Sequence, residues 1–439
     1  MVTSLSDAGI FTTVGAGRHY LAGSYRNCGV TTIDPSLAAD LKTRTTYPPL
    51  VLSGDFMVNT VLSPQAKRDT DVPDLGYEYD PLDYALSGLT LTNATLLLTN
   101  AVAIAVYGGN GLMLQSGAKL ISSGTPEKMN RVCPYYESQE AATNWGSAIT
   151  SLMRLPTGTI AVYPEVDFRF TDFSMGLGSP QLIQFDYAGV ARLSMRDCRV
   201  LGGSMYLGPY GVPVTVAVGL TNNLVESAYW WFDQGFLGTT TPVDLQLRNN
   251  LFYRGTLYFV LDNPNLPPWY VHDNFFCTNS LSVSVTNAIT NSYNAYYNTA
   301  ILPATWGNNK TNTSASFQTG WLGRFYYPTN GGAGTLTDLV DAGSRYATNA
   351  SLYAFTTATN QTKEAGSKVD IGFHFAAGTF AGPTFSTLDT DGDTLWDWWE
   401  DWNLNGSYDA AAGETDWQVY TSLFGIGPGP GLVVFTPLK

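Results

Sequence analysis

The hydrophobic positions between about residues 85 and 300 come in short runs that are separated by Gly and Asx turns. Residues 89–98 (LTLTNATLLL) and 111–121 (GLMLQSGAKLI) alternate or run apolar as β-strands do. No stretch in this region has the spacing of an amphipathic helix. The pattern therefore predicts an all-β region built from many short strands.

A period is visible within these strands. Short segments that end in an Asx residue recur 24 to 27 residues apart, at Asp172, Asp197, Asn222, Asn249 and Asp273. A β-prone run follows each of the last four, at residues 204–207, 228–232, 256–260 and 281–285. A repeat of this length with strands, no helix and a recurrent Asx turn is typical of one coil of a β-solenoid. We expect each Asx to stack on the next along the axis, with aromatic side chains layered inside.

A second, longer repeat indicates the domain organisation. The sequence DLGYEY at 74–79 is echoed by DIGFHF at 370–375, and GRHY at 17–20 by GRFY at 323–326. We therefore expect residues 1–84 to close a preceding β-helix-like module and residues 85–375 to form a parallel β-helix with its own closing segment. An acidic, Trp-rich segment follows at 376–424. Residues 425–439 are a Gly/Pro linker with one β-prone run at 432–438, which could add to the edge of a neighbour.

Composition and charge disfavour several classes of partner. Only 13% of the 439 residues are charged, and the net charge of −14 disfavours nucleic acid and anionic membranes as partners. No apolar run reaches the roughly 18 residues of a membrane span. The N-terminus lacks the features of a signal peptide, so we expect either a cytoplasmic chain or a fragment, and the repeats favour a fragment. The four cysteines show neither close pairing nor metal spacing, which favours buried free thiols.

The strongest chemical signature lies at residues 389–400, DTDGDTLWDWWE. The spacing is that of an EF-hand-type loop, in which alternate oxygens converge on Ca²⁺. Glycine is absent from position 6, where Thr394 stands, and Gly392 occupies position 4. The predicted ligands of this first loop are Asp389, Asp391, Asp393, the Leu395 carbonyl, Asp397 and Glu400.

A second loop follows directly. Its position 12 is Ala412, but Glu414 lies two residues further on and could reach the ion. The predicted ligands of this second loop are Asp401, Asn403, Asn405, Ser407, Asp409 and Glu414. We expect a structural role for the ions, because saturating carboxylates leave little room for substrate.

The neighbouring tryptophans allow two interpretations. They could stack on sugars, or they could form the small core of a metal-stabilised segment, which we favour. The residues are Trp396, Trp398, Trp399, Trp402 and Trp417.

Enzymatic activity stays an open question, and we favour a non-enzymatic role. The three histidines, His19, His272 and His374, are scattered, and the chain contains no Ser-His-Asp order, HExxH motif or phosphate loop. A carboxylate pair for glycoside hydrolysis could still assemble in the fold, with Asp172 and Asp197 as candidates. An Asx ladder supplies such neighbours for structural reasons as well.

Several segments resemble a known group of proteins. Residues 340–343 (VDAG) and 369–374 (VDIGFH) resemble the closing signature of right-handed parallel β-helix proteins of the pectate-lyase-like superfold. Residues 117–127, Asn130 and Gln139-Glu140 are similar to coils of very large extracellular proteins of Verrucomicrobia and related bacteria. The acidic run resembles thrombospondin type 3 and dockerin calcium repeats. The resemblance implies a secreted or surface-anchored protein without assigned activity, and the catalytic motifs of the β-helix lyases and hydrolases are missing.

Together these features predict a right-handed parallel β-helix with a small C-terminal calcium-binding appendage. We expect an extracellular protein with a structural, adhesive or assembly role, whose partners are other copies of itself or further domains of a longer chain. The alternative is a carbohydrate-active enzyme or polysaccharide-binding module that uses a groove on the flank of the helix.

Overall fold

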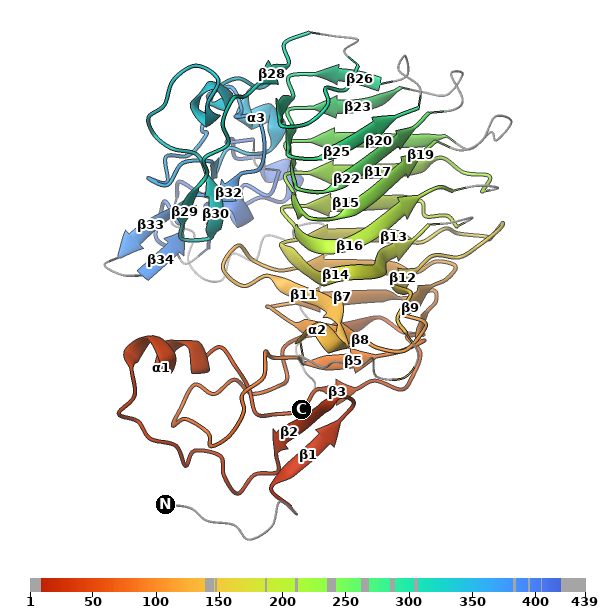
Figure 1. The fold of residues 1–439 in the computed structure, drawn as a ribbon, viewed down its shortest axis with the longest axis vertical. Coiled ribbons are helices and arrows are strands. Elements are labelled where there is room, and N and C mark those ends of the chain that lie inside the picture. Colours follow the sequence, from red (N-terminus) through yellow and green to blue (C-terminus); the bar gives the residue numbers. More distant parts are fainter. Residues whose placement is uncertain are drawn as a thin grey trace. The chain divides into compact units, whose positions relative to one another are not determined.

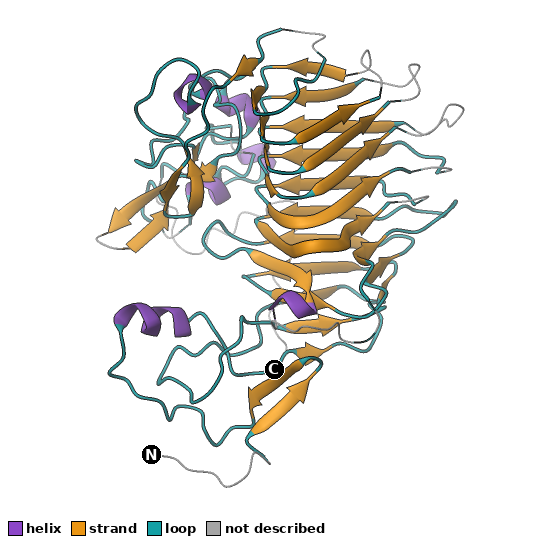
Figure 2. Ribbon diagram, in the orientation of Figure 1, coloured by secondary structure: helices purple, strands orange, loops and turns teal. Residues whose placement is uncertain are grey.

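The computed structural model describes residues 9–138, 146, 148–185, 188–209, 212–234, 242–261, 268–284, 289–303, 307–381, 384–393, 395–403 and 405–419. These residues form many short strands and few short helices (Figure 2). The chain divides into two compact units. Unit 1 comprises residues 1–246, 253–269 and 279–288, and unit 2 comprises residues 247–252, 270–278 and 289–439.

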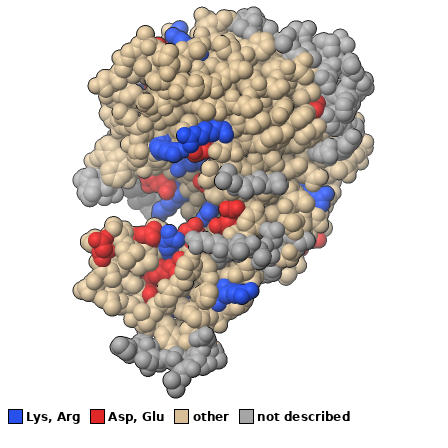
Figure 3. Space-filling model, in the orientation of Figure 1, with Lys and Arg blue, Asp and Glu red and all other residues tan. Residues whose placement is uncertain are grey.

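Unit 1 is a parallel β-solenoid, as the sequence predicted. One face is a sheet in which each strand pairs in parallel with the next one along the stack (Figure 1). Its strands are β4 (Thr60–Leu62), β7 (Thr95–Thr99), β10 (Lys119–Ser123), β13 (Glu165–Arg169), β15 (Arg192–Arg196) and β17 (Val216–Thr221). Figure 3 shows that most of the visible surface carries uncharged side chains.

The other strands of unit 1 also pair in parallel. One series is β3 (Leu50–Val51), β5 (Tyr84–Leu86), β8 (Ala103–Val106), β11 (Asn130–Pro134), β14 (Thr171–Gln184), β16 (Arg199–Leu207), β19 (Tyr229–Asp233), β22 (Thr256–Val260) and β25 (Ser280–Val283). A shorter series, β6 (Thr90–Leu91), β9 (Leu112–Leu114) and β12 (Ser151–Arg154), joins it at β14. Strand β18 (Leu224–Glu226) pairs with β16.

Alternation of the side chains fills the interior of the coils. In β15, Leu193 and Met195 are completely buried, whereas Arg192 is exposed. Burying such a side chain stabilises the fold by about 1.5–3 kcal/mol. The aromatic rings at inward positions stack from coil to coil, as expected. In unit 2, Phe276 lies between Phe252 and Tyr296 at 5.3 Å from each ring centroid.

The predicted Asx positions form a corner of the coil with left-handed backbone. Asp197, Asn222, Asn249 and Asp273 all have φ between 54° and 61°, a conformation in which Asn and Asp are enriched. The alignment of Asp172 was wrong. Arg169 pairs with Arg196, so that Phe170, with φ of 46°, is the equivalent of Asp197. Asp172 lies two residues further on and pairs with Arg199.

Side chains bond along the stack at this corner. In unit 1 the Asn222 amide donates to Asp197 Oδ1 over 2.8 Å, as predicted. The residue after each corner forms a second ladder, which the sequence analysis did not single out. In unit 2 Asn274 Oδ1 accepts from the Asn250 backbone N–H (3.0 Å), and Asn294 Oδ1 accepts from the Asn274 N–H (2.8 Å). An amide side chain can both donate and accept, so the ladder continues from coil to coil.

Unit 2 combines solenoid strands with irregular segments. Strands β24 (Phe275–Cys277), β27 (Ala295–Tyr297) and β28 (Lys310–Thr311) pair in parallel. Strand β26 (Ile289–Ser292) also belongs to unit 2. The residues of β20 (Val243–Arg248), β21 (Leu251–Tyr253) and β23 (Trp269–His272) are divided between the two units. The short helices of this unit are η1 (Leu336–Leu339), α3 (Ala347–Ala350), α4 (Asp397–Glu400) and η2 (Ala410–Ala412). Unit 1 contains α1 (Pro35–Leu41) and α2 (Tyr135–Ser138).

The longer sequence repeat corresponds to a repeated local fold. Each copy begins with an antiparallel hairpin, β1 (Phe11–Val14) with β2 (Gly17–Leu21) in unit 1 and β29 (Gln318–Gly320) with β30 (Gly323–Tyr326) in unit 2. We call residues 11–79 the N-terminal closing domain and residues 317–375 the C-terminal closing domain. The bonds Thr46 Oγ1–Asp74, Asn27 N–Asp74 Oδ1 and Gly29 N–Pro73 O recur as Thr357 Oγ1–Asp370, Asp341 N–Asp370 Oδ1 and Gly343 N–Val369 O.

The acidic segment follows the C-terminal closing domain. The antiparallel pair β31 (Phe355–Thr356) and β32 (Phe375–Ala376) ends that domain, and the hairpin of β33 (Gly378–Ala381) and β34 (Thr384–Thr387) begins the segment. The predicted linker and strand at 425–439 lie outside the described residues. Among the described residues no helix is long and apolar enough to cross a membrane. The cysteines are free thiols; Cys133, Cys198 and Cys277 are buried as expected, but Cys28 is exposed.

We predict that Asn274→Ala destabilises unit 2 by about 1–3 kcal/mol, because it leaves buried backbone groups of neighbouring coils unpaired. Asn274 is fully buried, and its amide also donates to the Leu247 and His272 carbonyls, both over 2.9 Å. Chemical denaturation gives the change in free energy. Asn349→Ala, at an exposed position of α3, is the control. Equal stability of the two variants would contradict a structural role for the ladder.

Candidate metal centre

The first acidic loop, residues 389–400, brings three carboxylates together. One oxygen from each of Asp389, Asp391 and Asp393 lies within 4.8 Å of the others. Asp389 Oδ1 accepts from the Gly392 N–H (2.8 Å) and Asp393 Oδ1 from the Leu395 N–H (2.8 Å). The turn uses Gly392, whose φ of 76° favours glycine. The sharp turn expected at position 6 is therefore supplied at position 4, and Thr394 itself lies outside the described residues.

The helix α4 returns the chain so that Glu400 faces the loop. Glu400 is 1% exposed, and neither carboxylate oxygen accepts a well-formed hydrogen bond, although the nearby Thr415 hydroxyl favours the charged form. Burial, with the carboxylates of Asp393 and Asp391 adding to it, raises the pKa of Glu400 to about 8. Burial, followed by the carboxylates of Asp393 and Asp389, also raises the pKa of Asp391.

Asp397, at position 9, has a different environment. Its Oδ1 accepts from the Thr390 N–H (2.7 Å) and its Oδ2 from the Thr390 hydroxyl (2.6 Å). The ammonium of Lys363 lies 3.9 Å from Oδ2. In this structure Asp397 therefore closes the loop through Thr390.

The second loop is closed by hydrogen bonds between its predicted ligands. Asp401 accepts from the N–H groups of Asn405 (3.0 Å) and Gly406 (2.7 Å). The Asn403 and Asn405 amides both donate to Asp409 Oδ2, over 2.8 and 2.7 Å. Ser407 is exposed and donates its N–H to Asn405 Oδ1.

Glu414 reaches this second loop, as its position suggested. Its Oε1 accepts from the Asn403 N–H (3.1 Å) and its Oε2 from the Asp409 N–H (2.9 Å). Glu414 thus takes the place expected of position 12, and Ala412 does not.

The two loops pack on the C-terminal closing domain through an aromatic contact. Lys363 lies 4.7 Å from the ring of Tyr353 and 4.9 Å from that of Trp417. Gly406 is also placed against Tyr353, because a Cβ at that position would lie 2.3 Å from the ring. Nothing in the sequence pattern singled out Tyr353 and Lys363, since they are distant in sequence from the loops.

The tryptophans of this segment mostly form a small core. Trp398 and Trp417 are buried, and Trp396 stacks on Trp398 with ring centroids 5.7 Å apart. Trp399 and Trp402 are exposed. This arrangement supports the core interpretation over a continuous sugar-stacking platform.

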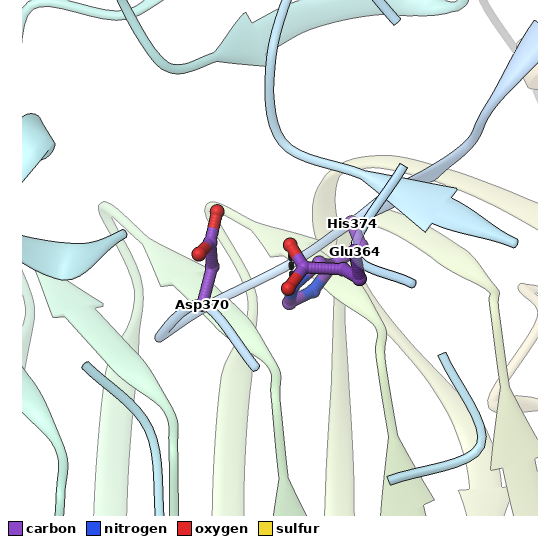
Figure 4. Close-up of side chains that lie close together, drawn as sticks. All are labelled: Glu364, Asp370 and His374. Carbon is purple, nitrogen blue, oxygen red and sulfur yellow. Dashed lines mark ion pairs between the residues drawn. The ribbon is translucent and has the colours of Figure 1, made fainter. Parts of the chain in front are cut away.

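A second cluster of titratable groups lies inside the C-terminal closing domain (Figure 4). One ligand atom from each of Glu364, Asp370 and His374 lies within 4.8 Å of the others, and all three residues are buried. His374 Nε2 is 3.3 Å from Glu364 Oε1. Burial raises the pKa of both carboxyls to about 7, and for Asp370 the Glu364 carboxylate adds to the shift.

The hydrogen bonds of this cluster indicate a structural network. Glu364 accepts from the Ser367 hydroxyl (3.3 Å), and Asp370 from the Asp341 N–H (2.7 Å) and the Thr357 hydroxyl. The N-terminal closing domain carries Asp69, Asp74 and Glu78 at the equivalent positions, with Asp69 Oδ2 accepting from the Asp74 N–H (2.8 Å). A network that recurs with a carboxylate in place of the imidazole fixes the loops of the domain and does not require a metal.

The catalytic candidates are held in polar contacts of their own. Asp197 binds Arg169 and Arg196 (3.3 and 3.2 Å), and Asp172 accepts from the Ser174 hydroxyl (2.6 Å). His272 Nδ1 lies 2.7 Å from the Ser292 hydroxyl, and burial, with Arg248 and Arg345 nearby, lowers its pKa to about 4. Such contacts are typical of structural roles for Asp172, Asp197 and His272.

The flank of unit 1 carries a polar hollow beside a row of aromatic rings. The hollow has a volume of about 370 Å³ and is lined by Gly109, Asn110, Thr150, Arg154, Gln181 and Gln184. Gln184 pairs in register with Tyr206, from which the outward-facing rings of Trp231 and Tyr258 continue. Trp231 and Tyr258 stack with ring centroids 4.7 Å apart.

Comparison with known proteins adds no further information, because no family model, curated protein or solved structure matches the chain.

We predict that Glu78→Gln reduces the loss of stability at high pH. Burial, followed by the Asp69 carboxylate, raises the pKa of Glu78 to about 8 in the folded chain. The folded state therefore keeps a proton that the unfolded state releases near pH 4.5, and stability falls as the pH rises between these two values. Between pH 5 and 9, Glu78→Gln should lose about 1–3 kcal/mol less than the parent chain.

Denaturant titrations at both pH values measure this difference. Glu127→Gln, at an exposed position, is the control and should follow the parent chain. The same pH dependence in all three proteins would show that Glu78 ionises normally.

Proposed function

We propose that the chain is a calcium-stabilised β-solenoid, secreted or at the cell surface, with a structural, adhesive or assembly role. The observation that carries the proposal is the Glu400 carboxylate, which is buried at the first acidic loop without a well-formed hydrogen bond. A buried carboxylate is costly unless it is paired or coordinates a metal. The residues around it offer further carboxylates and one distant ammonium, so a cation is the partner that is lacking.

The donor set of the first loop suits Ca²⁺. Asp389, Asp391, Asp393 and Glu400 supply hard oxygen ligands, and the Leu395 carbonyl stands at the position that contributes a backbone oxygen. Cys and His, the ligands that favour transition metals, are absent from the sequence of both loops. Asp397 supports this site through Thr390, and the ion would offset the repulsion among the carboxylates.

The second loop would hold a second ion through Asp401, Asp409 and Glu414, with oxygens from Asn403, Asn405 and Ser407. The two asparagine amides now donate to Asp409. Rotation of each amide by half a turn would direct its oxygen towards the same place, since the amide carries a donor at one side and an acceptor at the other.

A structural role follows from where the loops pack. Tyr353, Lys363 and Trp417 join them to the C-terminal closing domain. Ion binding that orders the loops therefore orders this contact as well, and a carboxylate-saturated ion leaves little room for substrate.

Polysaccharide binding at the flank of unit 1 is the second candidate function. The hollow beside Tyr206 is lined by polar side chains that can donate and accept hydrogen bonds, namely Asn110, Thr150, Arg154, Gln181 and Gln184. Ligand-binding sites commonly combine aromatic side chains with a small number of polar groups. Retention of the chain on neutral and acidic polysaccharides tests it. Retention that is lost in Arg154→Ala and kept in Arg324→Ala would support it, and an absence of retention would exclude it for the polymers used.

We predict that calcium raises the stability of the acidic segment and that chelation loosens residues 385–419 while unit 1 stays folded. At a calcium concentration 100 times the dissociation constant, linkage adds about 2.7 kcal/mol. Hydrogen exchange with and without a chelator locates the effect. Unfolding of unit 1 on chelation would contradict the local role.

We also predict that Glu400→Gln weakens calcium binding at the first loop by about 100-fold, because it removes the one bidentate carboxylate. Calorimetric titration of the metal-free chain gives the affinity. Asp416→Asn, in the same segment but outside both loops, should bind as the parent does. Equal binding by all three proteins would exclude the proposed site.

A further inference from the structure

The first coil of the solenoid, residues 50–62, forms one end of the parallel stack in unit 1 (Figure 1). Strand β4 is the terminal strand of its sheet and pairs with β7, and β3 pairs with β5. The N–H groups of Leu50 and Leu52 donate to carbonyls of the next coil, over 2.9 and 2.8 Å. Alternate residues of a strand direct their backbone groups to opposite sides, so those of Val51 point away from the next coil. This end of the stack therefore presents an open strand edge.

Apolar side chains are exposed along the same coil. Large aliphatic side chains between residues 50 and 61 have exposed fractions of 38–71%, namely Leu50, Val51, Met57, Val58 and Val61. Val51 pairs in register with Ala85 of the next coil, which is completely buried, whereas Val51 is 38% exposed. The apolar layer that fills the coils is thus open at this position. Such a cluster of exposed apolar groups marks an interaction surface.

Strand β28 of unit 2 shows how an edge of this solenoid is protected. It carries the charged side chain of Lys310, and the next residue, Asn312, donates its amide to the Thr335 carbonyl (2.8 Å). A charge on the edge strand and a segment beside it are common protections against strand addition. Strands β3 and β4 carry no charged residue, and Asp55 is the single charged residue in the first coil. The first coil therefore has the composition of a strand acceptor.

The sequence contains a segment that suits this edge. Residues 432–438 (LVVFTPL) are a β-prone run without charge, and they follow the Gly/Pro tether at 425–431. Both lie beyond residue 419, where the described part of the chain ends. Strand addition uses backbone hydrogen bonds for affinity and alternate side chains for specificity, so an uncharged run matches an uncharged apolar edge. Pro437 stands near the end of the run, where a missing N–H is tolerated.

We propose that residues 432–438 of a second copy of the chain add as a strand to the first coil. The proposal rests on the assembly role proposed above and names the two surfaces that would carry it. A second copy is the source because the exposed fractions of Met57 and Val58, 61 and 71%, show that no described part of the same chain covers them. Each copy then gives its run to one neighbour and receives a run from another. Such a head-to-tail contact continues from copy to copy.

The first test measures self-association of the full chain by sedimentation over a range of concentrations. Val61→Lys and Val434→Lys should each weaken association by at least about tenfold, because each places a charge in the apolar contact. Ile301→Lys, at a position that is 53% exposed outside the first coil, is the control and should associate as the parent does. Association that both variants leave unchanged would overturn the docking proposal and leave the assembly role standing. A parent chain that stays monomeric throughout would overturn both.

The second test asks whether the run binds the coil directly. The full-length Val434→Lys chain is mixed with a synthetic peptide of residues 431–439, and hydrogen exchange is followed at residues 50–62. The peptide should slow this exchange by at least about tenfold at saturation, since the open edge becomes hydrogen-bonded. The same peptide with Val434→Lys is the control and should have no effect.

Two results of this measurement would overturn the proposal. One is unchanged exchange at residues 50–62 with the unmodified peptide. The other is slow exchange there in the parent chain that is independent of concentration and is lost in Val434→Lys, because the run would then occupy the first coil of its own chain.

Discussion

The structure depends on how the corner of each solenoid coil is satisfied. A left-handed corner turns the backbone sharply and leaves polar groups that water cannot reach once coils are stacked on both sides. Asn and Asp side chains adopt this backbone conformation readily and bond to the coil above or below. The sheets keep their register because the corners do, and the apolar and aromatic layers follow from that register.

The same corner explains how the solenoid is joined to other parts of the chain. Asp273 is bound by Ser344 and Arg345, and Asn249 donates its amide to the Asp370 carbonyl (3.1 Å). One polar position thus stabilises the coil stack and also holds the closing domain. Only 13% of the residues are charged, and some of the carboxylates, such as Asp197 and Asp273, are buried in ion pairs with arginine side chains.

The acidic segment shows the opposite arrangement, in which negative charges gather without enough positive partners. Lys363 is the cation that the described residues place near Asp397, and Glu400 stays buried beside several other carboxylates. The proposed calcium ions would resolve this imbalance. They would also tie the segment to Tyr353 and Trp417, so that a local electrostatic requirement becomes a means of fixing one element on another.

The sequence by itself determined the fold class, the period of the coils, the repeated closing domains and the two acidic loops. These features are encoded by local patterns, namely strand alternation, Asx turns and carboxylate spacing, which hold whatever the rest of the chain does. Only the tertiary structure decided that Phe170 and not Asp172 occupies a corner, because strand register depends on partners many residues away. It also decided that Asp397 accepts hydrogen bonds from Thr390 and that Glu414 reaches the second loop. The two loops pack against Tyr353 and Lys363, which only the tertiary structure could show. Contacts between residues distant in sequence leave no periodic pattern in the sequence. Burial raises the pKa of Glu400 and Glu78, and burial depends on how the whole chain packs.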